Sequence, residues 1–104
     1  MAKVVSFRKP MRADIFETNV RDRSNFSHMV FMTPHIKERM KERNISQRQI
    51  LNALRKGSCA ENPVFNQAKA SYEGKMRHTG TGAEIVVVCA IVQSNLIVTA
   101  ITVY

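Results

Sequence analysis

The chain has 104 residues, which is enough for one domain and too few for two. Its 44% hydrophobic and 23% charged residues are typical of a folded protein, and no apolar run approaches the roughly 18 residues needed to span a membrane. The N-terminal sequence lacks the apolar core of a signal peptide, so we expect a cytoplasmic protein. Cys59 and Cys89 have neither the spacing of a metal site nor that of a disulfide framework, and no cofactor is expected.

The formal net charge of +8 is unevenly distributed along the chain. Residues 1–57 hold 13 of the 16 Lys and Arg residues and 5 of the 8 acidic residues, whereas residues 58–104 carry no net charge. Such clustering is typical of proteins that bind polyanions, and it predicts RNA or another polyanion as the partner. The alternative is that the excess of basic residues only keeps the protein soluble.

Residues 1–32 are expected to form a basic N-terminal extension that packs only in part. The sequence VVSF at residues 4–7 could be a short strand ended by Pro10. The stretch that follows is polar and mixed, without clean periodicity. We therefore expect residues 33–104 to form the folded domain and to stay folded when residues 1–30 are deleted.

Two adjacent helices are predicted from their end signals. Thr33 suits the N-cap and Pro34 the first position of a helix that ends at Asn44, a residue that tolerates the left-handed conformation. The sequence at 46–49 has the form of a capping box and begins a second helix, which Gly57 ends. The expected core residues of this helical hairpin are Ile36, Met40, Ile50 and Leu54.

After Gly57 the sequence becomes typical of strands. β-Branched residues are frequent at 83–92 and 96–104, two shorter strands are expected on either side of Gly74, and residues 79–82 indicate a turn. Helices followed by strands predict an α+β fold in which the helical hairpin packs on a three- to four-stranded antiparallel sheet. The residues expected to be buried in the sheet are Ile85, Val87, Ile97 and Ile101.

His35, Arg39 and Arg43 are candidates for a catalytic site because their i, i+4, i+8 spacing aligns them along one stripe of the first helix. A histidine can transfer a proton near neutral pH, and an arginine can bind a phosphate with two hydrogen bonds. Together they offer proton transfer and charge neutralisation for RNA cleavage without a metal. The alternative is an ordinary solvated helix face.

The predicted strands carry a second group of candidates. Strand alternation puts Lys75 and Arg77 on one face and His78 on the other, and these residues could bind substrate or merely protect an edge strand. In the last strand, Thr102 and Tyr104 are expected to point toward the more open surface, where Tyr104 could stack on a base. Ordinary β-propensity explains both residues equally well.

From Thr33 onward the chain resembles the bacterial family called domain of unknown function 4258. The resemblance lies in TPHIKERMKERNIS at residues 33–46, in the Ile50/Leu54 helix closed by Gly57, and in the terminal strand ending ITVY. The family usually has glycine at the position of Asn44. It is grouped with endoribonuclease toxins related to RelE and barnase, whose helices pack on a four-stranded antiparallel sheet.

This resemblance implies metal-independent cleavage of RNA by attack of the ribose 2′-hydroxyl. It makes His35, Arg39 and Thr102 the candidate catalytic residues, and it adds a cognate antitoxin or immunity protein as a candidate partner. Arg43 and Tyr104 come next, as substrate-binding residues. The competing hypothesis is a non-catalytic basic module, of a phage or plasmid type, that binds RNA or a host protein. The catalytic hypothesis requires His35 and Arg39 to converge with residues of the sheet.

Overall fold

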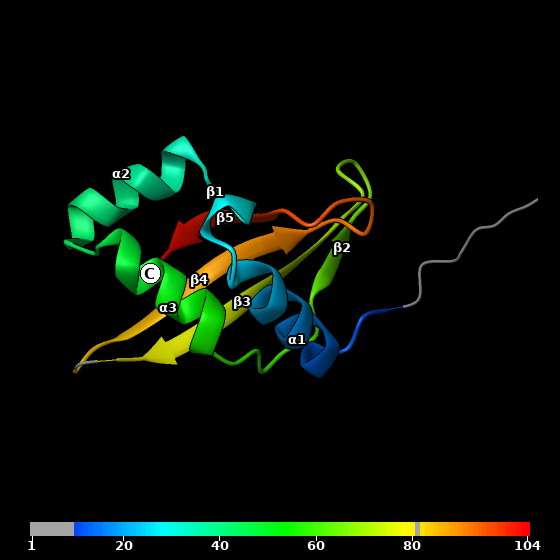
Figure 1. Ribbon diagram of the computed structural model, residues 1–104, viewed down its shortest axis with the longest axis horizontal. Coiled ribbons are helices and arrows are strands. Elements are labelled where there is room, and N and C mark those ends of the chain that lie inside the picture. Colours follow the sequence, from blue (N-terminus) through cyan, green and yellow to red (C-terminus); the bar gives the residue numbers. More distant parts are fainter. Residues whose placement is uncertain (1–9, 81) are drawn as a thin grey trace, which may run out of the picture.

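The computed structural model describes residues 10–80 and 82–104 (Figure 1). Within these ranges the chain has three α-helices, one short 3-10 turn and one five-stranded sheet, which confirms the predicted α+β class. The helices and the turn are α1 (Ala13–Ser24), η2 (Ser27–Met29), α2 (Pro34–Arg43) and α3 (Gln47–Lys56). The strands are β1 (Val30–Met32), β2 (Val64–Asn66), β3 (Ser71–Thr79), β4 (Glu84–Ile91) and β5 (Val98–Val103). The strand expected at residues 4–7 lies outside the described residues.

The five strands lie in the order β1-β5-β4-β3-β2. β1 pairs in parallel with β5, and the other neighbouring strands are antiparallel. The sheet is therefore mixed, and the prediction of a wholly antiparallel sheet of three to four strands is wrong. Both unexpected strands have only three residues, which is too short for a periodic pattern. The two strands expected around Gly74 are one continuous strand, β3.

The predicted ends of the helical hairpin are confirmed. The Thr33 hydroxyl accepts a hydrogen bond from the Ile36 amide at 3.1 Å, and Asn44 is left-handed with φ 56° and ψ 47°. Ser46 forms both hydrogen bonds of the capping box at the start of α3. Gly57 ends α3 in an extended conformation, and glycine is needed there because an added Cβ would lie 2.3 Å from the Ala53 carbonyl oxygen.

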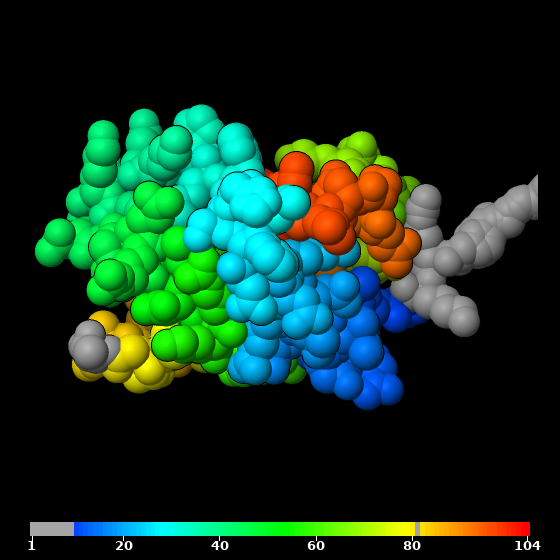
Figure 2. All heavy atoms as spheres, viewed as in Figure 1, coloured from blue at the N-terminus to red at the C-terminus, as the bar shows by residue number. Residues whose placement is uncertain are grey.

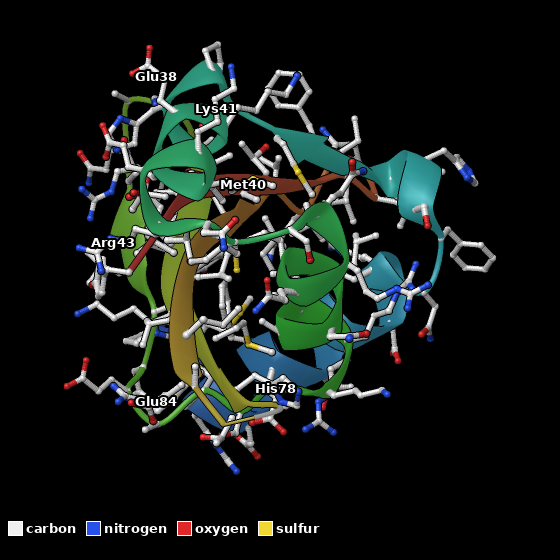
Figure 3. The ribbon with its side chains drawn as sticks, turned by 90° about the vertical axis from the view of Figure 1, so that its left-hand side faces the viewer. Glu38, Met40, Lys41, Arg43, His78 and Glu84 are labelled. Carbon is white, nitrogen blue, oxygen red and sulfur yellow. The ribbon has the colours of Figure 1, made fainter. Side chains whose placement is uncertain are left out.

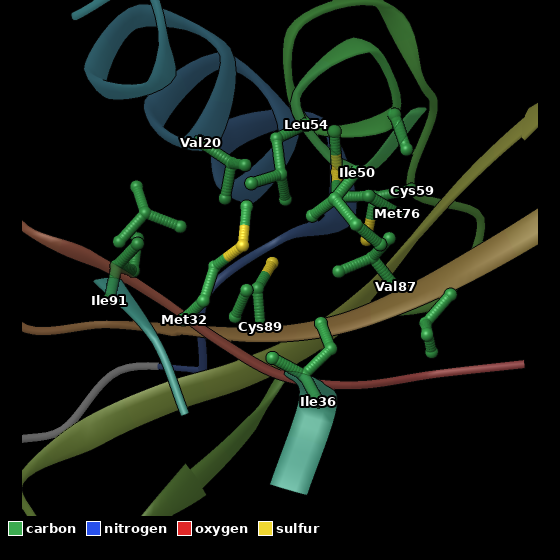
Figure 4. Packing of buried hydrophobic residues seen from close by; sticks show 14 of the residues in the cluster. Val20, Met32, Ile36, Ile50, Leu54, Cys59, Met76, Val87, Cys89 and Ile91 are labelled. Carbon is green, nitrogen blue, oxygen red and sulfur yellow. The ribbon is translucent and has the colours of Figure 1, made fainter. Parts of the chain in front are cut away.

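Helices α1 and α3 cover one face of the sheet, and the core lies between these two layers (Figure 1). The space-filling view shows this covered side, on which the β3–β4 hairpin emerges beneath α3 (Figure 2). Figure 4 shows Val20 and Leu54 of the helices facing Cys89 and Val87 of the sheet. We call the opposite side of the sheet the open face. The residues whose predicted burial is confirmed are Ile36, Ile50, Leu54, Ile85 and Val87.

Helix α1 contributes to this core, although the sequence around it looked polar and irregular. Phe16 and Val20 are fully buried, and the Phe16 ring lies so close to Gly74 that an added Cβ would be 2.6 Å from its Cε2. This differs from the expectation that residues 1–32 pack only in part. Two apolar residues one turn apart are enough to anchor a helix, but they are too few to stand out as periodicity. The domain boundary at residue 32 stays a prediction.

A β-bulge in β5 decides which side chains face the helices. Cys89 pairs with Ala100 and Val88 with Thr102, so Ile101 is the extra residue. Residues 101 and 102 together oppose Val88 on the open face, whereas Val98, Ala100 and Val103 point to the core and are fully buried. The prediction that Ile97 and Ile101 are buried is therefore wrong: Ile97 is 41% exposed, and Ile101 is only half-buried. Met40, also predicted to be buried, is half-buried as well.

Candidate active site

The corner between β1 and α2 is hydrogen-bonded to β5 through Thr33. The Thr33 amide donates to the Ala100 carbonyl at 3.2 Å, and its hydroxyl donates to the Ile101 carbonyl at 2.9 Å. The same hydroxyl caps α2 by accepting from Ile36. β1 thus covers the first half of the outer edge of β5, and the start of α2 lies beside the second half. This clamp fixes the position of the next helical residues relative to the open face.

His35 and Thr102 are in contact across this junction. His35 Nε2 lies 3.1 Å from Thr102 Oγ1, and the bulge at Ile101 is what turns Thr102 toward the open face. A hydroxyl can donate to a neutral ring nitrogen and accept from a protonated one, so the contact is compatible with both charge states of the imidazole. Two of the three candidate catalytic residues, 67 positions apart in the sequence, therefore form one polar pair.

Arg39 lies one turn beyond His35 on the same helix stripe. Its side chain is 29% exposed and makes a long ion pair with Glu42 at 3.7 Å. Its Nε is buried, and no described residue accepts a hydrogen bond from it. A ligand arriving from solvent can therefore reach only the other atoms of this 29% exposed side chain. Arg43, in the last turn, is exposed on the side of the sheet away from α3 (Figure 3).

The open face carries basic residues of β3 in register with this pair. Lys75 pairs with Val88, which pairs with Thr102, so Lys75 lies two strand spacings, about 10 Å, from Thr102. In the next row, Arg77 pairs with Val86, which exchanges two backbone hydrogen bonds with Tyr104. These cross-strand rows connect the predicted substrate-binding residues of β3 with the candidate catalytic residues of α2 and β5.

Acidic residues neutralise only part of this surface. Arg77 is paired with Glu84 at 3.2 Å, and Tyr104 is 43% exposed. Lys75 and Arg43 are exposed and form no ion pair with any described residue. Two unpaired cations therefore flank the His35–Thr102 pair and are available to a negatively charged ligand.

His78 is separated from the other candidates by the sheet itself. It pairs with Ile85 on the covered side and lines a hollow of about 340 Å³ together with Gln49 and Lys56 of α3. Figure 3 shows His78 and Arg43 on opposite sides of the strands. Alternation along β3 correctly predicted that His78 faces away from Lys75 and Arg77, and the structure shows that Lys75 and Arg77 lie on the open face.

Two features of this site were missed by sequence reasoning. Thr33 was recognised only as a helix cap, because its second hydrogen bond reaches a carbonyl 68 residues away. The bulge at Ile101 left no local signal, since the residues around it alternate like an ordinary strand. Both features depend on contacts between distant parts of the chain.

The described part of the chain contains no group of three or more His, Cys, Asp or Glu residues arranged to hold a metal ion. Its helices are also too short or too polar to cross a membrane. The site consists instead of one imidazole, one hydroxyl and several cations on the uncovered face of a sheet.

The fold and the site define an α+β domain with a five-stranded mixed sheet and a polar site at the junction of α2 and β5. Residues 32–104 match the model of the family described as "Domain of unknown function (DUF4258)", and the chain belongs to this family. The search of curated proteins and the search of solved structures found no match. The family assignment agrees with the resemblance seen in the sequence from Thr33 onward.

Proposed function

We propose that this protein is a metal-independent endoribonuclease of the kind represented by RelE- and barnase-like toxins. The observation that carries the proposal is the 3.1 Å contact between His35 and Thr102, beside Arg39 and in register with Lys75. A proton-transfer group and phosphate-binding cations on one open surface are the two requirements of RNA cleavage without a metal. The resemblance to the toxin families supports the same reaction.

The reaction uses the RNA itself as the nucleophile. The ribose 2′-oxygen loses its proton and forms a bond to the adjacent phosphorus, while the bond from phosphorus to the 5′-oxygen of the next nucleotide breaks. The leaving 5′-oxygen gains a proton. The products are a 2′,3′-cyclic phosphate and a 5′-hydroxyl, and no water, metal or oxidant is consumed in this step.

In this reaction His35 transfers a proton and Arg39 binds the phosphate. Thr102 is a positioning residue, because its hydroxyl holds the imidazole at the rim of the sheet in either charge state. The Arg39 side chain, which is 29% exposed and lies one helix turn from His35, is the proposed donor to the charge that develops on the phosphorane. Lys75 and Arg43 attract the RNA backbone, and Tyr104 and Arg77 extend the same surface.

The experiment is to incubate purified protein with total RNA in EDTA and to analyse the ends of the products. We expect products with 2′,3′-cyclic phosphate ends, and no cleavage of an oligonucleotide whose 2′-hydroxyls are replaced by hydrogen. His35→Ala should lower the rate by roughly 10²–10⁴. His28→Ala is the matched control, since His28 is an exposed histidine of η2 outside the site.

Arg39→Lys separates binding from catalysis. It keeps the positive charge and loses the planar pair of donors, so cleavage should fall substantially while most of the salt-dependent binding remains. Full activity of the His35→Ala variant would remove this residue from the mechanism. Binding without cleavage by the parent, on free or ribosome-bound RNA, would favour the non-catalytic basic module instead.

A further inference from the structure

Phe31, in the middle of β1, is a large aromatic residue on the open face. It pairs with Thr99, whereas its neighbours Val30 and Met32 pair with the fully buried Val98 and Ala100. Because side chains alternate along a strand, the Phe31 ring points away from the core, and it is 55% exposed. The fold does not require an aromatic ring at this position.

The ring belongs to the cross-strand row of residues next to the row that contains Thr102. Thr99 pairs with Ala90 and Thr102 with Val88, and Ala90 and Val88 are successive residues of β4 on the same face, about 7 Å apart. This is comparable with the length of one nucleotide of extended RNA. The Thr33 clamp directly follows β1 and precedes His35, so it fixes the backbone positions of Phe31 and His35 relative to each other.

The chemistry around Phe31 favours a nucleic-acid base as its ligand. An exposed ring offers a flat surface for stacking, and the cations of the neighbouring rows attract the phosphates that a base carries with it. This combination of aromatic residues with a basic surface is typical of single-strand binding. A base inside a duplex is already stacked and paired, so it cannot lie on a ring at the edge of a sheet.

We propose that Phe31 is a base-binding subsite that stacks an unpaired base next to the phosphate held by Arg39. This inference rests on the proposed function and narrows its substrate to single-stranded RNA. The stacked base aligns the RNA along the open face. The phosphate next to that base then lies beside His35, and the following nucleotides extend toward Lys75. Phe31 is thus a binding residue that takes no part in proton transfer.

The test measures binding with cleavage blocked, so that the two proposals can fail separately. The probe is a short, fluorescently labelled, mixed-sequence oligonucleotide of 2′-O-methyl RNA, which cannot supply the nucleophile. Phe31→Ala should weaken its binding about 5- to 100-fold, because stacking on one aromatic residue contributes that much per base. Phe31→Trp should bind at least as tightly as the parent. Phe26→Ala is the matched control, since Phe26 is 60% exposed and lines a hollow at the end of α1.

An abasic scan of the probe locates the subsite. Removal of one particular base should weaken binding to the parent and have little effect on binding to Phe31→Ala, because the two changes remove the same contact. A duplex of the same sequence should bind the parent and the variant equally. Equal affinity of parent and Phe31→Ala for the single strand, with both folded by circular dichroism, would overturn the subsite even if the protein cleaves RNA. If His35→Ala loses cleavage while Phe31→Ala binds the single strand as tightly as the parent, the proposed function stands and the base subsite is overturned.

Discussion

Arg21 of α1 and Arg55 of α3 each donate hydrogen bonds to the carboxyl end of the helix that carries the other. Arg21 reaches the Gly57 carbonyl at 2.7 and 3.0 Å and the Lys56 carbonyl at 3.2 Å. Arg55 reaches the Ser24 carbonyl at 2.7 Å. Two negative helix ends therefore meet, and a guanidinium from each helix stabilises the other. Some of the basic residues clustered in the N-terminal half, such as Arg21 and Arg55, therefore stabilise the fold, whereas others, such as Arg43, are exposed near the open face.

The first prediction concerns this reciprocal contact. Arg55→Met keeps the length and apolar stem of the side chain but leaves the Ser24 carbonyl without its charged donor, so it should lower the free energy of unfolding by about 1.5–3 kcal/mol. Urea titration is the measurement. Arg48→Met, at an exposed position of the same helix, should change it by less than about 0.5 kcal/mol. Equal stability of the two variants would contradict a structural role for Arg55.

The second prediction concerns the contact between Phe16 and Gly74. Phe16→Ala removes a fully buried ring and should cost about 3–5 kcal/mol, and Gly74→Ala should also destabilise, because its Cβ cannot fit against the ring. Ile15→Ala, at a 47% exposed position, is the control. Deletion of residues 1–30 should give a molten or unfolded chain by NMR dispersion, in contrast to the expectation from sequence. A well-dispersed spectrum would show that α1 is dispensable.

The third prediction concerns Thr33, which caps α2 and clamps it to β5. Thr33→Val keeps the shape but loses both hydroxyl contacts, so it should cost about 1–2 kcal/mol of stability. It should also slow RNA cleavage, because His35 is no longer fixed beside Thr102. Thr33→Ser restores the hydroxyl and should recover both properties. A serine variant that regains stability while cleavage stays slow would show that the methyl group, and not the clamp, matters for the site.

The fourth prediction concerns the unpaired cation Lys75. Lys75→Gln should weaken RNA binding and reduce the slope of log affinity against log salt by about 1, because one phosphate contact is lost. Lys69→Gln provides the comparison, since Lys69 is exposed in the β2–β3 turn, away from the rows of the site. Titrations at several salt concentrations decide between them. The same slope in the Lys75 variant as in the parent would place the RNA elsewhere on the molecule.

The fifth prediction concerns alkaline stability. Burial raises the pKa of the Cys89 thiol well above its ordinary value. The unfolded thiol ionises from about pH 8.5, whereas the folded one keeps its proton, so the unfolded state is favoured as the pH rises above that point. Cys89→Ala should therefore lose less stability per pH unit above about pH 8.5 than the parent does. The measurement is the free energy of unfolding as a function of pH for both proteins. If it falls equally steeply with pH in parent and variant, the Cys89 thiol does not cause the alkaline loss of stability.

Features that depend on residues close together in the sequence could be predicted, and features that depend on distant contacts could not. The caps at Thr33 and Ser46 and the turn at Asn44 are set by neighbours within a few residues, and they were predictable. The helix stripe of His35 and Arg39 was predictable for the same reason. That Thr102 faces the open side was also expected. The face assigned to Ile97 and Ile101 was wrong, because Val98 and Ala100 form the core side of β5. The bulge that brings Thr102 to the open side depends on pairing with β4.

Other features could not be read from the sequence for physical reasons. β1 has three residues, and its parallel pairing with β5 depends on contacts between positions 68 apart. Helix α1 buries its core contribution through Phe16 and Val20 within an otherwise polar segment. Phe31 became a candidate only when its pairing with Thr99 showed which way its ring points.

The site joins β1 and α2 to β5, which is synthesised much later, so it cannot form until β5 has been made. A ribosome makes His35 67 residues before Thr102. At about 5–20 residues per second, the helix stripe is complete several seconds before the strand that it must meet has been synthesised. During that interval the bulge, the clamp carbonyls and the Thr102 hydroxyl do not yet exist, so the nascent chain cannot hold His35 in its final position. The same molecule that binds RNA in our proposal would thus stay incomplete while it is next to the ribosomal RNA that makes it.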